Sequence, residues 1–253
     1  MSQKKIILVT GGSRGLGKDM AISIARKGMD VIITHRNNQA LADETVDAIK
    51  ALGQNAAAVH LNLSDFSSLD GFVKDIAVIL KEKFNAEKLD GLVNNAGMGA
   101  TVPFAQVTEE IFNDFLNVHF KGVYFLTQKL LPYMNDGSSI INISTGTTRF
   151  SNPGYSVYAS MKGAVEVLTK YMAKELGSRG ITANVVAPGP VETDFNNAAI
   201  RSNPNLKTML SNMSPLGRVG EAADIGSVVA FLCTDEAKWI NGQRIEVSGG
   251  INV

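Results

Sequence analysis

The chain has 253 residues, of which 45% are hydrophobic, and its 24 basic and 24 acidic residues give a formal net charge of +0. This balance provides no long-range field for nucleic acid or an anionic membrane surface, so we expect neither as a partner. The single cysteine, Cys233, excludes an internal disulfide or a cysteine-rich zinc site, and we expect no bound metal.

Short apolar runs alternate with longer amphipathic stretches along the whole chain. The predicted strands are Ile6–Thr10, Val31–Thr34, Ala56–Leu61, Gly91–Asn94, Ser139–Ile143, Thr182–Ala187 and Arg244–Val247. The predicted helices are Gly17–Lys27, Ala40–Leu52, Leu69–Phe84, Glu109–Met134, Ser156–Gly177 and Ala222–Thr234. Several strands are continuous apolar runs, which is typical of parallel strands covered on both faces. The alternation predicts an α/β fold with a doubly wound sheet of about seven parallel strands and helices on both faces.

The sequence contains no sign of a domain boundary. No linker, charge run or repeat divides the chain, so we predict one domain over residues 1–253. No apolar run reaches the roughly 20 residues of a spanning helix, and the start Met1–Lys5 is polar, so we expect a cytoplasmic protein. Residues 191–218 do not fit the alternation. We interpret them as a flap on the substrate side, with a plain surface excursion as the alternative.

A glycine-rich turn follows the first predicted strand and opens the first predicted helix. Residues 10–17 read TGGSRGLG, and their glycines permit a sharp turn and a close approach to a pyrophosphate. The helix N-terminus then faces the phosphates, although a tight turn without a ligand is the alternative. The residues predicted to bind the dinucleotide here are Gly11, Ser13, Arg14, Gly15, Leu16 and Gly17.

The glycine spacing resembles the cofactor motif of the short-chain dehydrogenase/reductase family. The resemblance continues in order through Asn94-Asn95-Ala96-Gly97, Ser144, Tyr158-x-x-x-Lys162, Pro188-Gly189-Pro190-Val191-Glu192-Thr193, Asn241-Gly242-Gln243 and Ser248-Gly249-Gly250. The chain looks most like the 3-oxoacyl-[acyl-carrier-protein] reductase-like branch. The resemblance implies a single-domain Rossmann fold and a nicotinamide-dependent oxidoreductase. It also implies that Asn62 and Leu63 border the adenine, that Asn95, Ala96 and Gly97 line the inner side of the cofactor, and that Pro188, Gly189, Val191 and Thr193 lie at its nicotinamide end.

The end of the second predicted strand favours NADP(H) over NAD(H). It reads Thr34-His35-Arg36 and lacks the acidic residue that would hold both ribose hydroxyls. Arg36 could pair with a 2′-phosphate, and the resemblance implies that Arg14 is a second basic contact. His35 could add a donor or stack on the adenine. Surface arginines with no such role are the alternative.

The predicted reactive group is Tyr158, supported by Lys162. The two residues are four apart on a predicted helix and therefore share one face. An ammonium near the phenol favours the phenolate, which lowers the phenol pKa toward the working pH of a general acid/base. Ser144 follows the fifth strand and is predicted to hold the substrate oxygen; the resemblance implies that Tyr158 and Lys162 also contact the cofactor. A surface Tyr–Lys pair is the alternative.

The sequence departs from the family in the long fourth helix. The family often has a catalytic Asn in an Asn-x-x-Gly pattern, whereas the aligned stretch Asn117-Val118-His119-Phe120-Lys121-Gly122 has His119 in that place. Asn117 would point about 200° away on an α-helix. His119 is therefore a candidate for the proton relay, with a space-filling role as the alternative.

The predicted function is an NADPH-dependent oxidoreductase that reduces a carbonyl or oxidises an alcohol. A non-catalytic NADPH-binding sensor or scaffold is the alternative. The substrate is left open between a 3-oxoacyl thioester and a small ketone. An acyl carrier protein is a possible partner, for which the candidate basic residues are Arg149, Arg201, Lys207 and Arg218. The resemblance implies a homotetramer or dimer formed through the fourth and fifth helices and the C-terminal strand.

Overall fold

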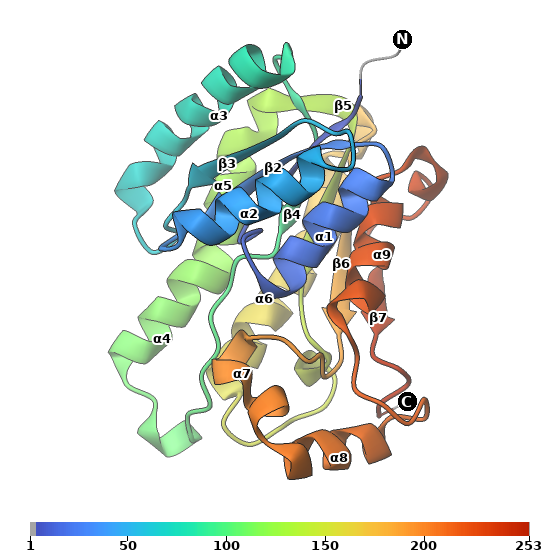
Figure 1. The fold of residues 1–253 in the computed structure, drawn as a ribbon. Coiled ribbons are helices and arrows are strands. Elements are labelled where there is room, and N and C mark those ends of the chain that lie inside the picture. Colours follow the sequence, from blue (N-terminus) through green and yellow to red (C-terminus); the bar gives the residue numbers. More distant parts are fainter. Residues whose placement is uncertain (1–3, 253) are drawn as a thin grey trace.

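The computed structural model describes residues 4–252, and a single parallel sheet forms their centre (Figure 1). Its seven strands are in the order β3-β2-β1-β4-β5-β6-β7, and every neighbouring pair is parallel. The strands are β1 (Ile6–Val9), β2 (Asp30–His35), β3 (Ala56–His60), β4 (Leu89–Asn94), β5 (Met134–Ile143), β6 (Thr182–Pro188) and β7 (Arg244–Val247). The predicted doubly wound Rossmann fold of seven parallel strands is confirmed.

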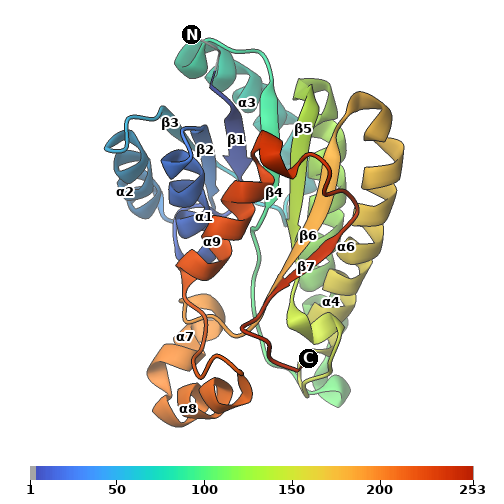
Figure 2. The ribbon, with the colours of Figure 1, turned by 90° about the vertical axis from the view of Figure 1, so that its right-hand side faces the viewer.

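Helices cover both faces of the sheet (Figure 2). On one face, α1 (Gly15–Arg26), α2 (Gln39–Lys50) and α9 (Ala222–Leu232) bury residues such as Met20, Ile49 and Val229 against the strands. On the other face, α3 (Leu69–Phe84), α5 (Gly122–Leu130) and α6 (Ser156–Glu175) do the same with Ile76 and Leu126. The strands between are buried on both sides, which explains their unbroken apolar runs. No helix within residues 4–252 is both long and apolar enough to cross a membrane.

The helix predicted over Glu109–Met134 is interrupted in the structure. It consists of α4 (Glu109–Leu116), a π-helical turn (Asn117–Lys121) and α5, and the chain leaves α5 through a short 3-10 turn that contains Pro132. Met134 begins β5 instead of ending the helix. The boundary was misplaced because Leu131, Tyr133 and Met134 continue the apolar pattern beyond the proline. A π-turn inserts an additional residue and shifts the helical faces on its two sides.

Residues 191–218 fold into two helices at the carboxyl edge of the sheet. They are α7 (Phe195–Ser202) and α8 (Pro204–Met213), which lie together below the strand ends in Figure 1. Asn203 caps α8 by accepting a hydrogen bond from the Leu206 backbone N–H, and Pro204 occupies the first turn. The segment predicted as a flap therefore has helical structure of its own, and its mobility stays a prediction.

Candidate active site

The glycine turn leaves an open, uncapped helix N-terminus at the end of β1. Gly11 and Gly15 have φ values of +67° and +55°, and a Cβ at Gly17 would lie 2.1 Å from the Gly11 carbonyl oxygen. Arg14 precedes α1 without a side-chain capping bond, and the first turn of α1 contains no acidic residue. The first backbone N–H groups of α1 are therefore available to an anion, which fits a pyrophosphate.

The glycine turn is also fixed by hydrogen bonds from Thr45 on α2 and from Asn95, which follows β4. Leu16 packs into the core beneath α1, while Ser13 is partly exposed and its carbonyl oxygen accepts a hydrogen bond from Thr45. From β4, the Asn95 side chain donates to the carbonyl oxygens of Thr10 (2.9 Å) and Gly11 (3.2 Å). Asn95 thus fixes the turn, and the adjoining Ala96 and Gly97 continue along the same edge, with Gly97 exposed.

The adenine end is assembled from the ends of β2 and β3. Arg36 is exposed directly after β2, as expected for a phosphate contact, and it forms no ion pair within residues 4–252. His35 is buried instead, with its ring 5.9 Å from the His60 ring, and burial lowers its pKa. Asn62 is partly exposed, whereas the Leu63 side chain lies in the core against Gly122. Leu63 can therefore face a ligand only through its backbone.

The residues expected at the nicotinamide end lie opposite the glycine turn. Pro188 ends β6, and Gly189 packs so closely on Ser248 that a Cβ would lie 2.7 Å from the Ser248 Cα. Val191 bridges to Gly220. Thr193 is buried and would lie 3.8 Å from a Cβ at Gly15, across the turn. The predicted cofactor residues from β1, β4 and β6 are therefore brought to one edge of the sheet.

Lys162 lies beneath the phenol of Tyr158. Its ammonium Nζ donates a 2.7 Å hydrogen bond to the Ile143 carbonyl oxygen and is 5.8 Å from the centre of the Tyr158 ring. Burial lowers the pKa of Lys162 to about 8. Burial also raises the pKa of Tyr158, so the net shift is opposite to the lowering that was predicted from the neighbouring ammonium. The phenol is thus held in its protonated form at neutral pH.

The structure places Ser144 differently from the prediction. Its side chain is 2% exposed, and its Oγ donates a 2.6 Å hydrogen bond to Glu166 Oε1 on α6. The same carboxylate oxygen accepts from Thr148 Oγ1 (2.7 Å) and Arg244 Nε (2.9 Å). The next residue, Thr145, is partly exposed, and its side chain acts on Tyr158 by lowering the pKa of the phenol, although burial raises that pKa more strongly. Thr145 is therefore a candidate site residue that the sequence reasoning did not name.

Strand alternation explains why neighbouring hydroxyls face different ways. Side chains along a strand point alternately to the two faces, so Ser144 shares a face with Asn142. Asn142 bonds to Thr169 on α6, which is three residues after Glu166. The residue after Ser144 is therefore not on the face that contacts Glu166, a signal that was present in the sequence.

His119 is enclosed within the π-turn and contacts Tyr158. Its ring centre is 5.1 Å from that of Tyr158 and 5.4 Å from that of Phe115. Nε2 lies 2.8 Å from the Met98 carbonyl oxygen and 3.2 Å from the Met98 backbone nitrogen, so one ring nitrogen faces both polar groups of Met98. Nδ1 is buried and has no hydrogen-bond partner among the described residues. Burial, followed by the charge of Lys162, lowers the His119 pKa well below its usual value, so the imidazole is neutral.

Because the imidazole of His119 is buried, we expect the unfolding free energy of the protein to depend on pH. Because the pKa of His119 is lower in the folded chain than in the unfolded chain, the unfolded state binds more protons as pH falls through about 6.5. We therefore expect His119→Gln, whose amide still reaches Met98, to lose less stability than the wild type between pH 7.5 and 5.5. Urea denaturation at several pH values measures the difference in unfolding free energy. If the unfolding free energy fell by the same amount with pH in both proteins, the expectation would be contradicted.

Comparison with known proteins covers almost the whole chain. A family model described as enoyl-(acyl carrier protein) reductase matches residues 11–252. The 3-oxoacyl-[acyl-carrier-protein] reductase FabG of Staphylococcus aureus (strain Mu50) is 36% identical over 253 residues, 99% of each chain. The promiscuous reductase LugOII, which catalyses a keto-reduction in lugdunomycin biosynthesis, has a TM-score of 0.93 at 38% identity over 99% of each chain. The angucycline C-6 ketoreductase LanV with bound NADP has a TM-score of 0.92 at 38% identity, over 98% of this chain and 95% of its own. The chain belongs to the short-chain dehydrogenase/reductase family.

Proposed function

We propose that the protein interconverts a carbonyl and an alcohol with NADP(H), using Tyr158 as general acid/base and Thr145 to hold the substrate oxygen. The observation that carries this proposal is the phenol of Tyr158 with the ammonium of the buried Lys162 5.8 Å from its ring centre, at the edge that contains the glycine turn. The protein is an oxidoreductase that acts on CH–OH or C=O groups, as its FabG and ketoreductase relatives are. The sensor or scaffold alternative is therefore not retained.

The cofactor is NADP(H), and the residues present fit it. The relative LanV has NADP bound, and the uncapped N-terminus of α1 suits the pyrophosphate. The exposed Arg14 and Arg36 suit a 2′-phosphate. When bound, NADPH supplies the reducing equivalent for the carbonyl.

The side chains supply the proton and hold the reacting oxygen. Thr145 Oγ1 donates a hydrogen bond to the substrate oxygen, and Tyr158 Oη donates its proton to that oxygen as negative charge develops there. The raised pKa of the phenol keeps it protonated at neutral pH. Lys162, anchored to Ile143, supports the phenolate that remains. His119 packs against the phenol ring, and its Nδ1 is a candidate acceptor in the relay that returns the proton.

A substrate panel tests the proposed function directly. Loss of NADPH absorbance is followed with linear ketones, ring ketones and 3-oxoacyl thioesters, with NADH in parallel assays. We expect turnover of at least one carbonyl class and a preference for NADPH. NADPH binding without consumption of any carbonyl or alcohol would contradict the proposal.

Arg36 is expected to determine the choice of cofactor. In Arg36→Asp the guanidinium is replaced by a carboxylate that repels a 2′-phosphate, so we expect the KM for NADPH to rise by about tenfold or more while that for NADH falls. Steady-state kinetics with both cofactors measures the change. Arg26→Asp, an equally exposed arginine at the opposite end of α1, is the matched control. If the ratio of the KM values for NADPH and NADH were the same in the Arg36 variant and in the control, Arg36 would not be part of the cofactor site.

We also propose a homo-oligomer, as the family resemblance implies. Its support is a set of large apolar side chains that are exposed on the outer faces of α4, α5 and α6, where a second copy could cover them. They are Phe112 (43% exposed), Tyr124 (40%), Phe125 (37%), Val167 (54%) and Tyr171 (62%). Light scattering after size-exclusion chromatography measures the mass, and a monomer would contradict this proposal.

A further inference from the structure

We propose that the substrate is an uncharged ring ketone that enters free from solution, and not a thioester delivered by an acidic carrier protein. This inference rests on the proposed carbonyl reduction and specifies its substrate class. Three features carry it: a cavity lined by uncharged residues at the start of α6, aromatic rings that flank the phenol, and ion pairs at the four basic residues considered for carrier-protein docking.

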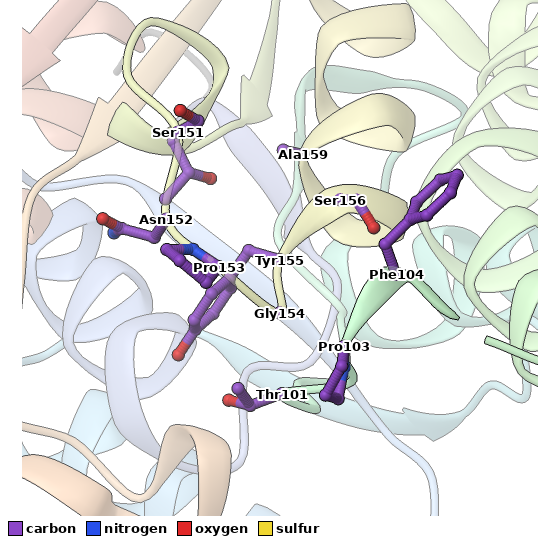
Figure 3. Close-up of a pocket in the computed structure, with 11 residues that line it drawn as sticks. Thr101, Pro103, Phe104, Ser151, Asn152, Pro153, Gly154, Tyr155, Ser156 and Ala159 are labelled. Carbon is purple, nitrogen blue, oxygen red and sulfur yellow. The ribbon is translucent and has the colours of Figure 1, made fainter. Parts of the chain in front are cut away.

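A cavity of about 490 Å³ opens beside Tyr155 and Ala159, which stand on either side of Tyr158 along the chain (Figure 3). Its size is within the usual range for small-molecule sites. Pro103 and Phe104 form one side, and the 151–156 loop with Tyr155 forms the other. Tyr155 and Ala159 line the cavity and immediately precede and follow the turn of α6 that carries Tyr158. All eleven lining residues are uncharged, and their polar groups are hydroxyls and an amide. The cavity therefore suits a neutral ligand with few hydrogen-bonding groups.

Two aromatic rings flank the phenol on this side. The Tyr155 ring centre is 6.4 Å from that of Tyr158, and the Phe195 ring centre on α7 is 6.0 Å away. Phe195 also covers Gly99, because a Cβ there would lie 2.8 Å from its ring atoms. A flat ring can pack against such walls at a small cost in conformational entropy, whereas a flexible acyl chain loses more freedom.

The position of α7 is set by polar contacts to the same cavity wall. Asn196, the residue after Phe195, donates through Nδ2 to the Tyr155 hydroxyl (3.2 Å) and lies 3.4 Å from Thr101 Oγ1. Tyr155 and Thr101 both line the cavity. These contacts fix the start of α7, and with it the ring of Phe195 beside the phenol, against two residues that line the cavity.

The four basic residues considered for carrier-protein docking are all ion-paired within the chain. Arg149 is 2.8 Å from Glu246, Arg201 is 2.9 Å from Asp194, Lys207 is 2.6 Å from Glu192, and Arg218 is 2.6 Å from Asp224. In addition, α4 begins with Glu109 and Glu110 a few residues after Phe104. Steering of an acidic partner requires a net positive surface, and here each cation is accompanied by a carboxylate.

The first test compares kcat/KM for 2-tetralone, acetoacetyl-coenzyme A and acetoacetyl-acyl carrier protein with NADPH. We expect the ring ketone to exceed both thioesters by at least about tenfold, with little dependence on salt because no charge contact is involved. A carrier-protein thioester that equals or exceeds 2-tetralone would overturn the inference and leave the proposed carbonyl reduction intact. Failure of every carbonyl compound would instead overturn the proposed function.

Two variants test the separate features. Phe195→Ala is expected to lower kcat/KM for 2-tetralone by about three- to tenfold and that for ethyl acetoacetate much less, since only the ring loses a packing partner. Equal losses of kcat/KM for both ketones would contradict a packing role of Phe195 toward the substrate ring.

A second variant tests the ion pairs. The double variant Glu192→Gln/Asp194→Asn removes the carboxylates that pair with Lys207 and Arg201. We therefore expect kcat/KM for the carrier-protein thioester to rise several-fold at low salt, while that for 2-tetralone is unchanged. Asp70→Asn, which releases Lys129 in an exposed pair between α3 and α5, is the matched control. An equal rise in this control would show that the ion pairs of Lys207 and Arg201 do not set the preference.

Discussion

Replacement of Tyr158 by phenylalanine is expected to reduce kcat for carbonyl reduction by about 10²- to 10⁴-fold, because the substrate oxygen then lacks its proton donor. The ring of the variant still packs between His119 and Phe195, so the fold of the site is preserved. Initial rates of NADPH consumption measure the loss.

Cofactor binding provides the control for this variant. NADPH affinity, followed by the fluorescence of the bound cofactor, is expected to change little because the residues that suit the phosphates, in the glycine turn and at Arg36, lie on other elements. Substantial residual turnover would remove Tyr158 from its assigned role. A large loss of NADPH affinity would assign it a binding role instead.

The hydroxyl of Thr145 is expected to matter far more for activity than that of Ser144. Thr145→Val keeps the shape of the side chain and removes the group that holds the substrate oxygen, so we expect kcat/KM to fall by about 10²- to 10³-fold. Thr145→Ser restores a hydroxyl and should keep most of the activity. Kinetics with a reducible ketone and NADPH compares the three proteins.

Ser144→Ala is the matched variant on the neighbouring residue. It removes one of the hydrogen bonds to Glu166, for which we expect a stability loss of about 1 kcal/mol and a change in kcat/KM of only a few-fold. Thermal and urea unfolding measure the first quantity. If Ser144→Ala were as inactive as Thr145→Val, the two residues would not have the different roles assigned here.

The sheet was largely predictable from the sequence because its signals are local. Runs such as Ile6–Val9 are long enough and apolar enough to define buried parallel strands. The glycine turn is similarly defined by backbone requirements at Gly11 and Gly15. From these features it could be predicted that the cofactor residues of several strands lie at one edge of the sheet. The burial of the Leu63 and His35 side chains could not be predicted in this way, because it depends on neighbours far along the chain.

The finer geometry of the site depends on contacts that no local pattern contains. The π-turn around His119 exists in a stretch whose apolar spacing also fits a continuous α-helix. Phe195 lies against Gly99, which is about a hundred residues earlier in the sequence, and against Tyr158, which is also far outside one helix, so no periodicity indicates its place. The pKa of Tyr158 likewise follows from the burial of the whole cluster, whereas sequence spacing identifies only its nearest cation.

The bonds to Glu166 have a mechanical consequence. Glu166 lies on α6, the same helix that carries Tyr158 and Lys162, and it holds the loop before the helix through Ser144 and Thr148. The proton donor, its cation and the loop with Thr145 are consequently tied to one helix. If residues 191–218 open as the predicted flap, we expect the spacing between the reacting hydroxyls to stay unchanged, because none of these bonds to Glu166 involves α7.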